Sequence, residues 1–230
     1  MQRHFDEQMD DLLQKLLRMG SLAESMIQTA MRTLIERDES LCQEVVRKEQ
    51  EVNNLQIEID DRAVTLTALQ QPVAADVRFL FMASRIATEL ERIGDQAVNI
   101  CQNSHHVLSA PPLKPLVDLP LMGEISEKMV RDGLDALVRK DCALANQVFL
   151  DEKKVDAFRN QIFRVLLTYM MADPGTIERS LALILISRNL ERVGDHATNI
   201  AEEVIYLVEG REVRHHREAK NRTVCSEEDK

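Results

Sequence analysis

The chain has 230 residues, 44% of them hydrophobic, which is enough for one ordinary domain or two small ones with a sizeable core. It contains only seven glycines, six prolines, two tyrosines, six phenylalanines and no tryptophan, so it is poor in the residues that build hairpins and β-sandwiches. Its 39 acidic and 29 basic residues give a net charge of -10, which excludes a general attraction for nucleic acid. We therefore expect an all-α protein that does not bind nucleic acid.

The first half of the chain predicts three long helices. Apolar residues at alternating steps of three and four predict a first helix over about residues 4–36. Asp38 is placed to cap a second helix that runs to about residue 69, and Pro72 stands where a third helix would begin and continue to about residue 105. Short connections between long helices predict an antiparallel three-helix bundle.

A segment rich in proline separates this pattern from a second copy of it. Residues 103–120 hold four of the six prolines, which favours a linker. Beyond it we expect helices over about residues 122–139, from Asp141 to about 171, and from the turn Asp173-Pro174-Gly175 to about 208, with Gly210 as the C-cap. The predicted domains are residues 1–107, a linker at 108–120, residues 121–209, and a flexible charged tail at 210–230.

The two halves also repeat at the level of sequence. Residues 91–100, ERIGDQAVNI, return as residues 191–200, ERVGDHATNI, with seven identities in ten and no gap. In the second helices, residues 49–53 correspond to residues 152–156, a displacement of 103 instead of 100. The chain is therefore predicted to be a tandem duplication of a three-helix bundle, with six long helices.

Carboxylate and amide side chains recur in this duplicated frame at a spacing of four residues, which places them in one direction on a helix. The candidate metal ligands are Glu49, Asn53, Glu91, Asp95, Asn99, Glu152, Asp156, Glu191, Asp195 and Asn199. Oxygen ligands favour Mg²⁺, Ca²⁺, Mn²⁺ or ferric iron over zinc. Gly94 and Gly194 leave space for an ion, a water molecule or a close helix neighbour. The alternative is that these acidic stripes only solvate the bundle.

Other residue patterns give little support for catalysis. No phosphate-binding glycine loop, nucleophile elbow or serine triad is visible, so we expect no enzyme and no catalytic residues. The four cysteines are far apart and are expected to be reduced thiols. His196 is expected to be a plain surface histidine, and the alternative is that it is an outer ligand or a proton donor beside Asp195. The opening stretch lacks a secretory signal and no window has the roughly 20 apolar residues of a membrane span, so a cytoplasmic location is expected.

The doubled ERxGDxxxNI motif, ADVR at residues 75–78, MGSLAESMIQTA at 19–30 and LTYMMADPGTIERS at 167–180 closely resemble the PhoU family over about residues 3–210. The resemblance implies a cytoplasmic, dimeric accessory protein of the phosphate-specific ABC transporter. Such proteins restrain phosphate uptake and are needed to shut off the phosphate two-component system.

The same resemblance implies particular partners and ligands. The partners would be the transporter ATPase, PstB, and the sensor histidine kinase, PhoR, through which the protein would associate peripherally with the membrane. Family members carry metal ions on E(D)xxxD motifs, and Asn53 replaces the usual Asp, so we expect weaker metal binding in the first half. A regulatory adaptor is the favoured function. The alternatives are a metal-dependent phosphohydrolase and a purely structural helical scaffold.

Overall fold

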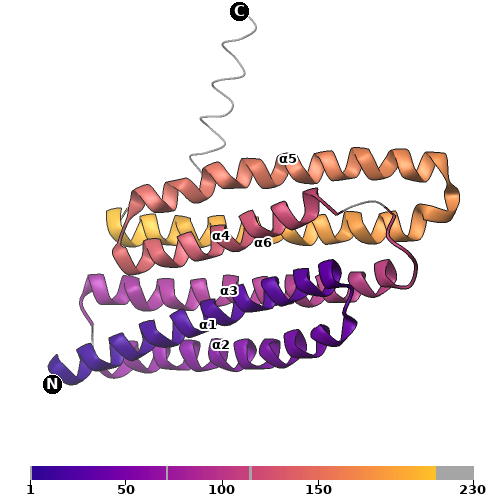
Figure 1. Cartoon of the computed structure of the whole chain (residues 1–230). Helices are drawn as coiled ribbons and strands as arrows, with labels where there is room; N and C mark the ends of the chain where they lie inside the picture. Colours follow the sequence, from indigo (N-terminus) through magenta and orange to yellow (C-terminus); the bar gives the residue numbers. More distant parts are fainter. Residues whose placement is uncertain (1, 71, 114–115, 211–230) are drawn as a thin grey trace, which may run out of the picture.

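The computed structural model describes residues 2–70, 72–113 and 116–210, and these ranges are helical without any strand (Figure 1). The six long helices are α1 (Gln2–Glu36), α2 (Cys42–Gln70), α3 (Ala74–Leu108), α4 (Asp118–Arg139), α5 (Cys142–Ala172) and α6 (Ile177–Glu209). Two short 3₁₀ turns, η1 (Glu39–Leu41) and η2 (Pro174–Thr176), precede α2 and α6. The predicted duplication of an antiparallel three-helix bundle is confirmed.

The two bundles are packed on each other through their inner helices. Helix α3 packs on α6 and α1 packs on α4, whereas in the described part of the chain α2 and α5 contact only elements of their own half. Figure 1 shows the consequence, with α2 and α5 on opposite outer faces and the other four helices between them. The buried apolar side chains of both halves form one continuous core.

A pseudo-two-fold relation connects the halves where α1 meets α4. A Cβ on Gly20 of α1 would overlap Leu134 of α4, and a Cβ on Gly123 of α4 would lie 3.0 Å from Met31 Cγ of α1. Gly20 and Gly123 occupy equivalent positions in the repeat, as do Met31 and Leu134. Each bundle therefore lacks a side chain at the place where the other bundle inserts an apolar one, which lets the two helices approach closely.

The junctions between first and second helices follow the sequence expectation. Asp141 caps α5, with Oδ1 accepting hydrogen bonds from the backbone of Ala143 at 2.8 Å and Leu144 at 3.1 Å. Asp38 instead caps the short turn η1 that leads into α2, and its Oδ1 accepts from the backbone of Ser40 at 3.0 Å. These contacts satisfy backbone N–H groups that have no partner within the helix.

The start of α4 differs from the expectation. The helix begins at Asp118, four residues earlier than the predicted residue 122, and Pro120 lies in its first turn. A first-turn residue has no carbonyl partner for its N–H in the helix, so proline is tolerated there.

Gly210 ends α6 with φ 67°, as expected of a C-cap glycine. The remainder of the predicted tail, residues 211–230, lies outside the described residues. None of the described helices is both long and apolar enough to cross a membrane.

Candidate functional site

In the first bundle, acidic side chains of α2 and α3 face one another. Burial raises the pKa of Glu91, and the negative charges of Asp95 and Glu49 raise it further. The charges of Arg92 and His196 act in the opposite direction without cancelling this effect. The structure therefore brings Glu49 of the second helix near the carboxylate pair of the third, and the negative charges of Glu49 and Asp95 disfavour the ionised form of Glu91.

Asn53 lies one turn beyond Glu49 on the same face of α2. Its Nδ2 donates a hydrogen bond to Glu49 Oε1 at 3.4 Å. Its Oδ1 is buried and has no hydrogen-bond partner among the described residues. An unsatisfied buried acceptor is uncommon in a folded protein. The last predicted ligand of this half, Asn99, is half-buried on α3, where its backbone carbonyl accepts a bond from Asn103 at 2.7 Å.

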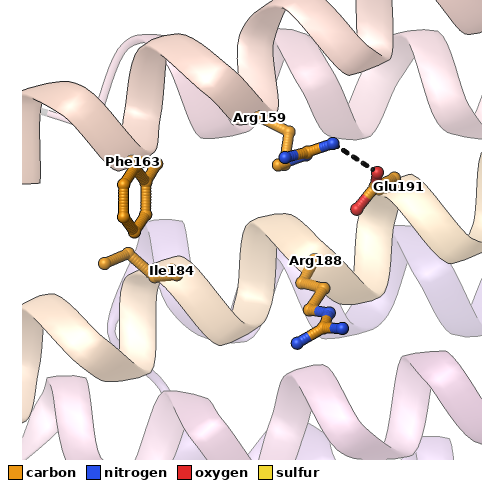
Figure 2. Close-up of a pocket in the computed structure, with 5 residues that line it drawn as sticks. All are labelled: Arg159, Phe163, Ile184, Arg188 and Glu191. Atoms are coloured by element: carbon orange, nitrogen blue, oxygen red, sulfur yellow. Dashed lines mark hydrogen bonds and ion pairs between the residues drawn. The ribbon is translucent and has the colours of Figure 1, made fainter.

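The equivalent face of the second bundle contains an arginine among its carboxylates. Burial raises the pKa of Asp195, and the charges of Glu191 and Asp156 add to this effect. However, Arg159 of α5 donates a hydrogen bond to Glu191 Oε1 at 2.9 Å (Figure 2). Glu152 is half-buried on α5, one turn before Asp156. The guanidinium of Arg159 thus neutralises the carboxylate of Glu191, which would otherwise be available to a cation.

This ion pair forms the wall of a cavity of about 310 Å³ between α5 and α6. Figure 2 shows Phe163 and Ile184 at one end of it, and Arg159, Arg188 and Glu191 at the other. The repeat places Gln56 at the position equivalent to Arg159, so the arginine belongs to the second half alone. The two acidic faces therefore differ in charge although their sequence motifs are alike.

The two motif glycines make room for methionine. A Cβ on Gly94 would lie 3.3 Å from Met26 Cε and 3.7 Å from Val52 Cγ1. A Cβ on Gly194 would lie 3.4 Å from Met129 Cε and 3.6 Å from Val155 Cγ1. Of the three uses expected for this space, the structure shows a close helix neighbour, because side chains of the first and second helices of the same bundle fill it.

Within the described ranges, no three His, Cys, Asp or Glu side chains are grouped closely enough to hold a metal ion. The oxygen ligands predicted for the second half are also separated from one another, because the stripe on α6 turns as it proceeds along the helix. Asn199, eight residues after Glu191, donates from Nδ2 to Glu89 Oε2 of α3 at 2.9 Å and therefore faces the other bundle. The predicted ligands of the second half are thus divided between the α5 side and the α3 side of α6.

The contact around Glu89 was missed in the sequence, and the expected surface position of His196 is wrong. His196 Nδ1 lies 2.7 Å from Glu89 Oε2, and both side chains are largely buried, with 16% and 14% exposure. Burial alone would raise the pKa of Glu89, but the hydrogen bonds from His196 and Asn199 outweigh it and lower the pKa. Arg85 of α3 adds a second polar contact across the same interface, to Glu203 of α6 at 3.2 Å.

A sequence signal for this interface exists in the width of the apolar arc. Besides the seam residues, such as Ala83, Ile86 and Leu90, helix α3 also buries Leu80, Met82 and Val107, so its apolar arc covers more of the helix circumference than a single seam requires. A helix with so wide an apolar arc has neighbours on two sides, and α3 indeed lies between its own bundle and α6. Polar residues at the edge of that second side, such as Glu89, are then expected to be paired.

Comparison with known proteins identifies relatives over nearly the whole described chain. A model of the PhoU domain matches residues 16–104 and again residues 119–204. The phosphate-specific transport system accessory protein PhoU homolog of Pseudomonas putida is 38% identical over 93% of this chain and 84% of its own length. The Escherichia coli accessory protein PhoU is 34% identical over 92% of this chain and 88% of its own.

Solved structures agree with these matches. The crystal structure of PhoU from Pseudomonas aeruginosa has a TM-score of 0.86 and 38% identity, and covers 90% of this chain and 100% of that one. The phosphate transport system regulatory protein PhoU from Streptococcus pneumoniae has a TM-score of 0.81 and 25% identity, covering 91% and 99%. The chain therefore belongs to the PhoU family.

Proposed function

We propose that this protein is a non-enzymatic regulatory adaptor of phosphate uptake. The observation that carries the proposal is that both halves, and more than nine-tenths of the chain, match proteins named as accessory or regulatory components of phosphate transport. In this function the protein restrains the phosphate ABC transporter and reports the state of the transporter to the phosphate two-component system.

The proposed partners are the transporter ATPase, PstB, and the sensor histidine kinase, PhoR, which would bring a cytoplasmic homodimer to the membrane. The two outer helices, α2 and α5, are on opposite sides of the molecule, and each forms one of the two acidic faces with its inner neighbour, α3 or α6 (Figure 1). An adaptor needs more than one accessible face, and this architecture supplies two that differ in charge because only one contains Arg159.

We further propose that the acidic faces take hard cations such as Mg²⁺, Mn²⁺ or ferric iron. The first half offers oxygen donors of the type such ions prefer, since the charges of Asp95 and Glu49 raise the pKa of Glu91 and Asn53 Oδ1 is buried without a partner among the described residues. Its carboxylates would have to move closer together to hold the ion, because they are not grouped closely enough in the structure. In the second half Asp156, Glu191 and Asp195 offer the same chemistry, but Arg159 competes for Glu191. This reverses the expectation from the sequence, in which the missing charge at Asn53 made the first half the weaker one. A bound cation would neutralise the face and allow it to meet an anionic partner surface.

A pull-down tests the adaptor function. The wild-type protein is presented to PstB and to PhoR at high and low phosphate, and binding to at least one partner should depend on the phosphate level. Absence of binding to both partners at every phosphate level contradicts the proposal.

A matched pair of variants tests the role of the acidic face. Glu91→Gln with Asp95→Asn removes two charges from the face, and Asp10→Asn with Asp61→Asn removes two exposed charges elsewhere in the same bundle. If the cations bridge to a partner, only the first variant should lose manganese in elemental analysis and lose partner binding. Equal metal content in both variants contradicts cation binding at this face.

The alternative of a metal-dependent phosphohydrolase is tested separately, because carboxylates could hold catalytic ions. The purified protein, with its metal complement restored, is assayed for phosphate release from phosphate compounds. Turnover that is abolished by Asp95→Ala and Asp195→Ala would contradict a purely non-enzymatic function.

A further inference from the structure

Two cysteines and a threonine from three different helices meet in the first bundle. Cys42 lies at the start of α2, Cys101 in α3 and Thr33 near the end of α1. The Cys42 thiol donates to Thr33 Oγ1 at 3.8 Å, and the Cys101 thiol is within hydrogen-bonding reach of both Cys42 Sγ and the Thr33 hydroxyl. Both cysteines are free thiols in the structure.

The two thiols differ in their access to solvent. Cys42 is partly exposed, whereas Cys101 is buried with 5% exposure. Burial raises the pKa of Cys101, and the hydrogen bond and charge of Cys42 raise it further. Since the thiolate is the reactive form of cysteine, Cys101 is protected from direct attack by small reagents and Cys42 is the point of entry.

The second bundle provides an internal comparison. The positions equivalent to Thr33, Cys42 and Cys101 are Ala136, Ala145 and Ala201, and all three alanines are fully buried. The fold therefore packs well at this place with alanine alone. Neither sulfur is required by the architecture, and the pair of neighbouring thiols is a feature of the first half only.

We propose that Cys42 and Cys101 form a reversible disulfide, with a low-molecular-weight disulfide such as oxidised glutathione as the oxidant. Neighbouring thiols are the arrangement in which such an exchange ends in a protein disulfide instead of a mixed one. The disulfide would tie the start of α2 to α3 in one bundle and leave the other bundle unchanged.

The reaction balances in two exchange steps. The Cys42 thiolate attacks one sulfur of the small disulfide, which forms a mixed disulfide at Cys42 and releases one small thiol. Cys101 then loses its proton and attacks Cys42 Sγ, which forms the Cys42–Cys101 bond and releases the second small thiol. Each protein sulfur gives up one electron, and the small disulfide takes up both as it is reduced to two thiols. Excess small thiol reverses the sequence.

The test uses the full-length chain with Cys142→Ala and Cys225→Ala, so that only the proposed pair can react. The folded protein is incubated with oxidised glutathione, and its intact mass, free-thiol content and non-reduced peptides are measured. We expect a loss of two hydrogen masses, no remaining free thiol, and a peptide that joins Cys42 to Cys101. Reduced glutathione in excess should restore both thiols.

Two further variants separate the steps, and both copy the packing of the second bundle, so both should fold. With Cys101→Ala, Cys42 should stop as a mixed disulfide, one glutathionyl mass heavier. With Cys42→Ala, Cys101 should react at least about tenfold more slowly than Cys42 does.

Several results would overturn the proposal. These are a stable mixed disulfide at Cys42 in the parent with Cys101 free, two separate mixed disulfides, no reaction in the folded protein, or a cross-link that forms only with loss of the helical circular dichroism signal. The last result would mean that the thiols meet only in opened chains.

Discussion

Two glutamates on α3 are predicted to affect stability in opposite directions. Glu89 faces α6 and accepts hydrogen bonds from His196 and Asn199, which lower its pKa. Glu91 faces α2, where burial and the charges of Asp95 and Glu49 raise its pKa. The substitutions Glu89→Gln and Glu91→Gln each remove one charge and keep the size of the side chain, so the difference between them reports the surroundings alone.

The magnitudes follow from the contacts. Glutamine at position 89 retains acceptor capacity but loses the charge assistance of two hydrogen bonds, at 2.7 and 2.9 Å, worth about 1 kcal/mol each. The variant should therefore lose about 2 kcal/mol of unfolding free energy at neutral pH, or roughly 4–8 °C in melting temperature for a chain of this size. Removing the charge of Glu91 relieves repulsions of about 0.2–0.5 kcal/mol each, so Glu91→Gln should gain about 0.5 kcal/mol.

The pH dependence should differ in sign as well. The lowered pKa of Glu89 contributes stability that is complete above the ordinary value of 4.5 and is lost as the pH falls through the folded-state value. The raised pKa of Glu91 means that its carboxylate costs stability once the pH rises through the folded-state value, and costs nothing below 4.5. The stability gained by Glu91→Gln should therefore vanish at about pH 4.

Urea unfolding followed by circular dichroism, at neutral pH and at about pH 4, measures both effects. Asp61→Asn is the control, because Asp61 is exposed and no ion pair is described for it, and its unfolding free energy should be unchanged. The reasoning is refuted if both glutamine variants shift stability in the same direction at neutral pH. It is also refuted if Glu89→Gln has no effect.

Three further predictions concern the second bundle, its helix cap and the contact between the bundles. Arg159→Gln copies the first half and frees Glu191, so calorimetric titration with Mn²⁺ should show tighter binding than in the wild type; unchanged binding contradicts competition by the arginine. Asp141→Ala removes the α5 cap and should cost about 1 kcal/mol in urea unfolding, and no loss would contradict its capping role. Gly20→Ala forces a methyl group against Leu134, so its free energy of unfolding in urea should fall by an overpacking cost of about 1–3 kcal/mol less a helix-propensity gain of about 1 kcal/mol; a rise refutes the close approach.

Helix positions and the core were predictable because they depend on local spacing. Leu12, Leu16 and Met19 follow the predicted seam of the first helix, and all three are fully buried. Asp141 and Gly210 mark helix ends through chemistry that involves only the next few residues. The internal repeat gave a second, independent basis for the number of helices, because the three helices predicted in one half imply three equivalent helices in the other.

The partners of the site residues were not predictable in this way. A pair such as Arg159 with Glu191 depends on how far two helices slide along each other, and apolar periodicity does not fix that register. Likewise, spacing placed Asn199 on the same stripe as Glu191, but eight residues of helix turn it far enough to meet Glu89 of the other bundle. By contrast, the electrostatic effect of Asp95 on Glu91 was predictable, because the two residues are four positions apart on the same helix.

The duplication explains which positions stayed alike and which diverged. Met26, Val52 and Gly94 fill one space, and Met129, Val155 and Gly194 fill its equivalent, because the distance between packed helices leaves little freedom there.

Positions that do not set the distance between packed helices differ between the two halves, and they differ in charge and in chemical reactivity. Gln56 corresponds to Arg159, and the neighbouring thiols Cys42 and Cys101 correspond to alanines. A cation, a thiol reagent or a protein partner therefore meets two different surfaces on a symmetric scaffold. It follows that variants made in one half at a time, and not in both together, will separate the functions of the two faces.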